Sequence, residues 1–152
     1  MTRARCIGCF LAIVMILGGT AHATSVGLAA GLDPTGVFLV NALTELPISP
    51  AFDLRAEVGF ATGDMAGLML VTASVLGHHV FERVDPFLGL GVGVALTPPP
   101  FSTGLVLEGA AGVRLLPVDA VALFVQVRYL VRWLNDGFTS GPVYEAGLEV
   151  RF

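Results

Sequence analysis

The chain has 152 residues, of which 55 % are hydrophobic and only 13 % are charged, and its formal net charge is −4. Soluble domains usually carry about 25 % charged residues, and disorder requires low hydrophobicity with high charge, so this composition excludes a disordered chain. It also excludes a typical nucleic-acid binder, because all eight basic residues are arginine and they form no basic patch.

The first 23 residues have the layout of a secretory signal peptide. Two arginines give a positive start, a short apolar run follows, and Ala21 and Ala23 form a small-x-small cleavage site. An uncleaved membrane anchor would need roughly 18 or more apolar residues, and this run is shorter. We therefore expect a signal peptide over 1–23 and a mature domain over 24–152, which contains no cysteine.

Clusters of proline, glycine, aspartate and asparagine divide the mature chain at regular intervals. They lie at 33–36, 47–50, 62–64, 83–86, 98–100, 117–119 and 135–137. Such clusters are typical of turns. They separate eight segments of about ten residues or slightly more, the length that a tilted strand needs to cross a bilayer. Membrane helices fit poorly, because the long uncharged window 86–107 contains three consecutive prolines, each of which costs about 3 kcal/mol inside a helix.

Hydrophobic residues alternate with polar or small ones within these segments. Over 52–60 one face carries Phe, Leu, Ala, Val and Phe, and the other carries Asp, Arg, Glu and Gly. The segments 88–96, 121–133 and 144–152 repeat the pattern. This period of two predicts strands with one apolar face and one polar or small face.

The polar face carries a balanced set of charges, which indicates whether this face points into the barrel or away from it. The set is Asp53, Glu57, Glu108, Glu145 and Glu149 with Arg55, Arg114, Arg128, Arg132 and Arg151. Confined charges have to be paired, so a balanced set suits an enclosed interior. We therefore expect the charges to line a lumen and the apolar face to contact lipid. Arg128 and Arg132 are expected to face Glu145 and Glu149 on the adjacent strand.

Strands in lipid must close into a barrel, because every backbone polar group needs a partner. The predicted fold class is therefore all-β, an eight-stranded antiparallel up-and-down transmembrane barrel whose interior is filled by side chains. Aromatic residues prefer the two membrane interfaces. With both termini on the periplasmic side, six aromatic residues are expected to form these girdles: Phe38, Phe52, Phe60, Trp133, Tyr144 and Phe152.

The C-terminal segment 145–152 resembles the final-strand signal of bacterial outer-membrane β-barrel proteins, with Gly147 and Val150 before the terminal Phe152. The segments 47–57 and 84–93 look like the turn-to-strand starts of small barrels of the OmpA/OmpW kind. The resemblance implies export, outer-membrane localisation and recognition by the secretion and barrel-assembly machinery. The expected loops are short, unlike those of adhesive or receptor-binding members of the family.

Two motifs that could carry chemistry are better explained by structure. The run Gly89-x-Gly91-x-Gly93 does not complete a dinucleotide fingerprint, and we expect small inward residues of a crowded barrel. Adjacent His78 and His79 would point to opposite sides of a strand, whereas a metal site needs three or four convergent ligands. Both also lie far from the outer rim, where barrel enzymes of this family place a Ser–His pair. We therefore expect no cofactor, no metal and no enzyme activity.

The favoured function is that of an outer-membrane barrel with a structural or envelope-maintaining role, as a monomer in contact with outer-membrane lipid. One alternative is a narrow pore or transporter for ions or small apolar solutes. Another is a secreted soluble barrel that binds a small ligand, which would need an apolar lumen.

Overall fold

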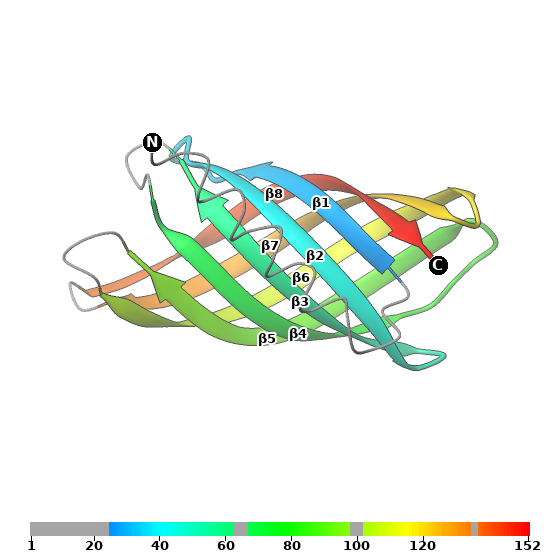
Figure 1. Cartoon of the computed structure of the whole chain (residues 1–152), viewed down its shortest axis with the longest axis horizontal. Coiled ribbons are helices and arrows are strands. Elements are labelled where there is room, and N and C mark those ends of the chain that lie inside the picture. The colour runs from blue at the N-terminus through cyan, green and yellow to red at the C-terminus, as the bar shows by residue number, and fades with distance from the viewer. Residues whose placement is uncertain (1–24, 63–66, 98–101, 135–136) are drawn as a thin grey trace, which may run out of the picture.

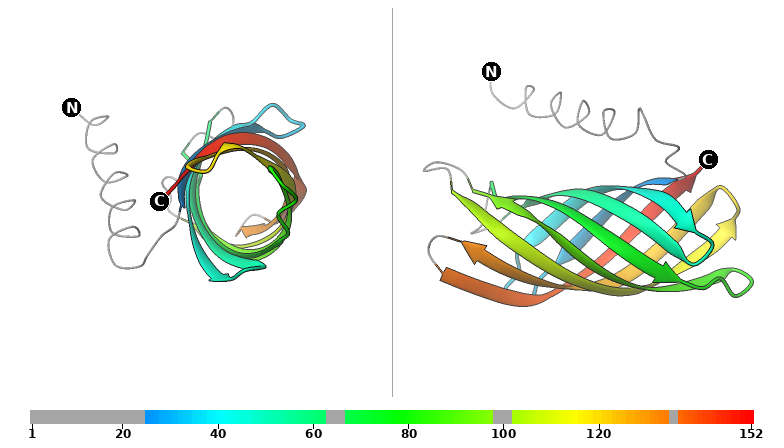
Figure 2. Two further views of the ribbon diagram at one scale, coloured as in Figure 1. Left: turned by 90° about the vertical axis from the view of Figure 1, so that its right-hand side faces the viewer. Right: turned by 90° about the horizontal axis from the view of Figure 1, so that it is seen from below.

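The computed structural model describes residues 25–62, 67–97, 102–134 and 137–152, and these form a closed antiparallel barrel in which each strand pairs with the next (Figure 1). The strands are β1 Ser25–Leu32, β2 Phe38–Ser49, β3 Phe52–Ala61, β4 Met69–His78, β5 Val84–Leu96, β6 Thr103–Val118, β7 Val121–Leu134 and β8 Gly137–Arg151. Pairing of β1 with β8 closes the ring, as the view along the barrel shows (Figure 2). The predicted fold class is confirmed.

The predicted signal peptide, with Ala21 and Ala23, lies outside the described residues, as do the predicted turn at 98–100 and parts of the predicted turns at 62–64 and 135–137. Within the described residues there is no helix with the length and hydropathy needed to span a membrane. We call the end of the barrel where β1 begins and β8 ends the terminal end, and the opposite end the loop end.

The turn predicted at 83–86 is displaced toward the N-terminus. Phe81 and Val84 exchange two backbone hydrogen bonds of 2.7 and 2.8 Å, so the turn closes at Glu82 and Arg83. Glu82 has a φ of 55°, the left-handed conformation that such a tight turn demands. The predicted extent was wrong: β5 already starts at Val84, and Asp85 is a strand residue whose side chain is buried.

The two faces of the wall carry different side chains. Leu88 and Leu90 of β5 are 69 % and 77 % exposed, whereas Arg114 of β6 and Arg128 of β7 are almost fully buried. Gly91 lies on the buried face, where a Cβ would approach the Ser74 Cβ to 2.6 Å and Glu108 Oε1 to 2.7 Å. Only a glycine leaves room for these neighbours, so the glycine run of β5 serves packing.

Candidate functional site

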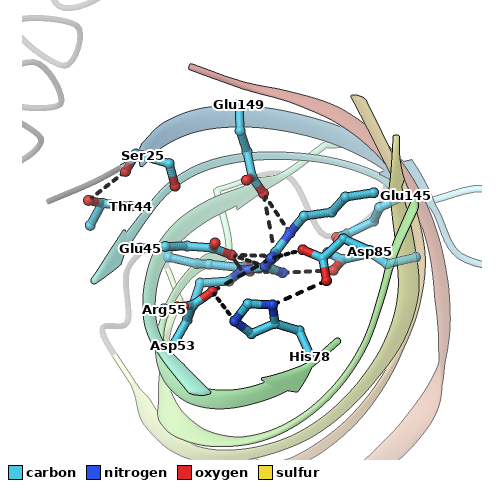
Figure 3. A network of polar contacts seen from close by, with 12 residues as sticks. Ser25, Thr44, Glu45, Asp53, Arg55, His78, Asp85, Glu145 and Glu149 are labelled. Atoms are coloured by element: carbon cyan, nitrogen blue, oxygen red, sulfur yellow. Dashed lines mark hydrogen bonds and ion pairs between the residues drawn. The ribbon is translucent and has the colours of Figure 1, made fainter. Parts of the chain in front are cut away.

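Charged side chains gather inside the barrel from its terminal end to its middle, which we call the charge network (Figure 3). It joins seven carboxylates to three arginines, contributed by six of the eight strands. The members are Glu45, Asp53, Glu57, Asp85, Glu108, Glu145 and Glu149 with Arg55, Arg114 and Arg128.

Arg55 of β3 reaches across the barrel. Its Nε donates to Glu45 Oε1 at 2.6 Å on the neighbouring strand, and its Nη1 donates to Gln126 Oε1 at 2.8 Å on β7. The guanidinium carbon lies 5.1 Å from the ring centroid of Phe87 and 5.6 Å from that of Phe124. Aromatic faces attract a cation, most strongly where water is excluded, so these inward rings help to hold the buried charge.

Arg114 of β6 binds the carboxylates nearest the terminal end. Its Nη2 donates to Glu45 Oε1 at 2.7 Å and its Nη1 to Asp85 Oδ2 at 3.0 Å. Its guanidinium carbon also lies 4.7 Å from the ring centroid of Phe87. Glu45 therefore links Arg55 to Arg114, and one carboxylate connects two cations from different strands.

Arg128 of β7 is the centre of the deeper part of the charge network. Three glutamates from three other strands surround it: Glu57 at 2.6 Å, Glu108 at 2.5 Å and Glu145 at 3.2 Å. Glu145 also accepts hydrogen bonds from the side-chain amides of Asn41 and Gln126. Fully buried ions keep their charge only with such partners, so the loss of Arg128 would leave three carboxylates without their shared cation.

His78, the last residue of β4, lies between two carboxylates (Figure 3). Its Nδ1 is 3.1 Å from Asp85 Oδ1, and its Nε2 is 3.4 Å from Asp53 Oδ2. A cavity of about 310 Å³ at the terminal end is lined by His78, Glu45 and Asp53 among others. His79 packs against the Phe81 ring instead, at a centroid distance of 4.4 Å. Among the described residues, no three His, Cys, Asp or Glu side chains are placed to bind a metal ion.

The expected ladder between β7 and β8 is only half right. Arg128 contacts Glu145, but Arg132 is opposite Thr139, and Glu149 is opposite Ala122. Glu149 instead lies 3.5 Å from Arg55 and 3.7 Å from Arg114. The antiparallel register explains the difference, because four residues from Arg128 to Arg132 on β7 lead toward the loop end, whereas four residues from Glu145 to Glu149 on β8 lead toward the terminal end.

Two of the predicted lumen residues lie outside the charge network as defined above. Arg132 is half-buried near the loop end of β7. Arg151 is 28 % exposed at the terminal end, 3.6 Å from Asp85.

The predicted set of lumen residues did not include Glu45, Asp85, Asn41 and His78. Period two over 38–49 would have found two of them, because Asn41 and Glu45 share a face with Leu39 and Leu43.

The interior changes character toward the loop end. The same inward face that carries the charges carries buried apolar side chains there, which pack into one cluster, and the half-buried Arg132 lies beyond it. We call it the apolar plug: Val37, Leu39, Ala61, Leu68, Leu70, Ala95, Val106, Leu130 and Val143. The expectation of a polar interior along its whole length was therefore wrong for this half of the barrel.

The predicted girdle residues all have exposed side chains on the outer wall. Phe38, Phe60 and Trp133 lie at the loop end, and Phe52 and Phe152 at the terminal end. Tyr144 departs from its predicted place near a strand end. It lies at the middle of β8, seven residues from Gly137 and seven from Arg151, because β8 extends beyond its partner β1.

The predicted assembly signal lies on β8 and just after it. Gly147 is opposite Ala29 and Phe124, Val150 faces outward, and Phe152 is 83 % exposed. Its recognition by an assembly machinery stays a prediction.

Comparison with known proteins gives structural likeness without sequence likeness. No family model and no curated protein matches the chain. The barrel is similar to the crystal structure of Neisserial surface protein A, NspA (19 % identity, TM-score 0.66, covering 85 % of this chain and 94 % of that one). It is also similar to the N-terminal β-barrel domain of Pseudomonas aeruginosa OprF (10 % identity, TM-score 0.72, covering 87 % of this chain and 98 % of that one). A third similar structure is the outer membrane enzyme PagL (14 % identity, TM-score 0.61, covering 84 % of this chain and 99 % of that one). The chain thus has the fold of small outer-membrane β-barrels.

Proposed function

We propose that this chain is an integral outer-membrane β-barrel with a structural, envelope-maintaining role and a closed interior. An apolar outer wall around buried charges suits hydrocarbon as the surrounding solvent. The fold likeness to NspA and OprF supports the same environment. Export through the secretion machinery and insertion by the barrel-assembly machinery follow from this proposal, with Gly147, Val150 and Phe152 as part of the recognised signal.

The observation that supports a closed interior is that two groups of side chains fill the barrel one after the other along its axis. The charge network occupies the terminal half, and the apolar plug occupies the loop half. Ions would have to pass Leu39, Leu70 and Leu130, which are each at most 2 % exposed. This arrangement argues against the alternative of a narrow pore. The exposed apolar outer wall likewise argues against a secreted soluble barrel.

A non-catalytic role is part of the proposal. The histidines of the described chain lie at the terminal end, and His78 lies between two aspartates. PagL shows that this fold can support an enzyme, so the proposal rests on the residues of this chain and on no general property of the fold.

Single-channel recording in planar bilayers tests the closed interior. We expect no conductance above the leak of the bare bilayer for the wild-type protein. Arg128→Ala removes the central cation of the charge network but leaves the apolar plug intact, so it should also be silent. Discrete channel openings of the wild-type protein would contradict the proposal and favour a pore. Partition of the native protein into the soluble periplasmic fraction would contradict the outer-membrane assignment.

A further inference from the structure

The cavity at the terminal end of the barrel lies directly against the charge network. We call it the terminal cavity; its volume is about 310 Å³, and polar side chains from five strands line it. These side chains include Ser25, Glu45, Asp53, His78 and Arg151. Binding sites for small molecules begin at roughly 300 Å³, so the terminal cavity has room for a small organic group.

The part of the charge network next to the terminal cavity has more carboxylates than arginines. With Arg151 included, four carboxylates meet three arginines there: Glu45, Asp53, Asp85 and Glu149 with Arg55, Arg114 and Arg151. Arg55 is also shared with Glu57, at 3.4 Å. While His78 is neutral, at least one carboxylate therefore has no cation of its own. Buried charges are stable only when they are paired, so a positively charged ligand would complete the balance.

His78 offers a hydrogen-bond acceptor that no donor reaches. Its Nδ1 lies 3.1 Å from Asp85 Oδ1, and because an ionised carboxylate only accepts, Nδ1 carries the proton of the neutral ring. Nε2 is then an acceptor, 3.4 Å from Asp53 Oδ2 and without a hydrogen bond (Figure 3). Two acceptors so close together are unfavourable unless a donor serves both.

Ser25, the first residue of β1, offers a further unpartnered group. Its side chain is on the inward face of the strand, together with Gly27 and Ala29, and the residue is only 3 % exposed. The Ser25 carbonyl accepts a hydrogen bond from Thr44 Oγ1, but the Ser25 hydroxyl has no hydrogen-bond partner among the described residues. A buried hydroxyl without a partner costs free energy, so this group also favours a polar ligand in the terminal cavity.

We propose that the terminal cavity binds a primary ammonium group, carried either by a small free amine or by a phospholipid headgroup. The positive charge offsets the excess of carboxylates. Its three N–H donors match three acceptors at the terminal cavity: Asp53 Oδ2, His78 Nε2 and Ser25 Oγ. Arg151 is 28 % exposed beside them, so the phosphate of a headgroup would meet a guanidinium.

Two other cations compete for the same place. A metal ion needs three or four convergent ligands, and within the described ranges no three His, Cys, Asp or Glu side chains are placed for it. A second proton on His78 would put an N–H at Nε2, but the contact with Asp53 there lacks hydrogen-bond geometry. That proton would also leave the Ser25 hydroxyl without a partner. An ammonium group serves all three acceptors, which favours it over both.

Isothermal titration calorimetry of the folded protein in detergent micelles tests the site. Ethanolamine and choline are compared at equal ionic strength, because choline carries the same charge but has no N–H on its nitrogen. We expect saturable binding of ethanolamine and at least tenfold weaker binding of choline. Undetectable binding of ethanolamine, or equal binding of the two amines, would overturn the proposal.

Three variants locate the binding. Asp53→Asn removes a charge from the terminal cavity and Ser25→Ala removes the unpartnered hydroxyl, so each should weaken ethanolamine binding severalfold. Glu82→Gln is the matched control, because it removes a charge from the exposed β4–β5 turn at the same end of the barrel. Heat-modifiable gel mobility identifies the folded samples. If both cavity variants bound ethanolamine as tightly as Glu82→Gln, the amine would bind elsewhere and the proposal would fail.

Native mass spectrometry separates the two sources of the ammonium group. The protein is released from micelles that contain equal amounts of phosphatidylethanolamine and phosphatidylcholine. A headgroup ligand predicts retained phosphatidylethanolamine that Asp53→Asn loses, whereas a free amine predicts ethanolamine binding without a preference between the lipids. The calorimetry requires only a folded barrel, so its failure is distinct from a failure of the proposed outer-membrane role.

Discussion

Arg128 and Leu130 occupy successive inward positions of β7, and between them the interior of the barrel changes from charged to apolar. Arg128 is surrounded by three glutamates, whereas Leu130 belongs to the apolar plug. The same change occurs on β6 between Glu108 and Val106. On these adjacent strands the two changes are offset by two residues, because Glu108 pairs with Leu130, and together they divide the interior into a charged part and an apolar part.

Replacement of Arg128 by alanine should weaken the fold strongly. Glu57, Glu108 and Glu145 would lose the cation that they share, and stranding a buried ionic partner costs about 3–5 kcal/mol. The measurement is the urea midpoint of unfolding in lipid vesicles. Arg83→Ala is the control, because Arg83 is exposed and donates to one backbone carbonyl, that of Pro117. Equal midpoints for the two variants would show that Arg128 is not the centre of the charge network.

Added volume at Gly91 should also destabilise the barrel. A Cβ there would press on Ser74, Glu108 and the Ala73 carbonyl oxygen at 2.6–2.8 Å, and overpacking typically costs about 1–3 kcal/mol. Gly91→Ala should therefore fold in lower yield than wild type. Gly109→Ala, on the outer face of the neighbouring strand, should fold normally because its Cβ meets one side-chain atom at 3.8 Å. The opposite order of yields would mean that the two glycines face the other way.

An arginine on the outer wall should harm insertion. Leu148 is 44 % exposed on β8, and an arginine near the middle of the bilayer costs roughly 2–4 kcal/mol. Leu148→Arg should therefore give a lower yield of heat-modifiable, folded protein in vesicles. The matched control is Thr35→Arg, in the turn between β1 and β2. If Leu148→Arg folded as well as the control, position 148 would not face hydrocarbon.

Much of the fold is readable from the sequence, because strand faces follow local rules. Turn residues and the period of two are sufficient to predict the eight strands and the outward direction of the Leu88, Leu148 and Phe152 side chains. Asp85 was missed because a proline follows it, and the pair was interpreted as turn chemistry. The structure places both in β5, whose hairpin turn is tighter.

The partners inside the barrel are not readable in the same way. Glu149 meets Arg55 and Arg114, which lie 94 and 35 residues away in the chain. These contacts depend on the width of the barrel interior and on how far the strands are staggered when the barrel closes, which no local pattern encodes. The apolar plug was missed for a different reason. Leu39, Leu70 and Leu130 resemble lipid-facing leucines, although the period of two places each of them on the same inward face as Asn41, Thr72 and Arg128, respectively.

The most direct test of the account is a scan of lipid contact along β7. Single cysteines at positions 122–127 would carry a fluorophore, and quenching by brominated lipids would report which side chains touch hydrocarbon. We predict strong quenching at Leu123, Val125 and Val127 and weak quenching at Ala122, Phe124 and Gln126, in accordance with their exposure. Quenching with the opposite period, or none at any position, would contradict a barrel whose apolar wall faces lipid and whose charges lie within.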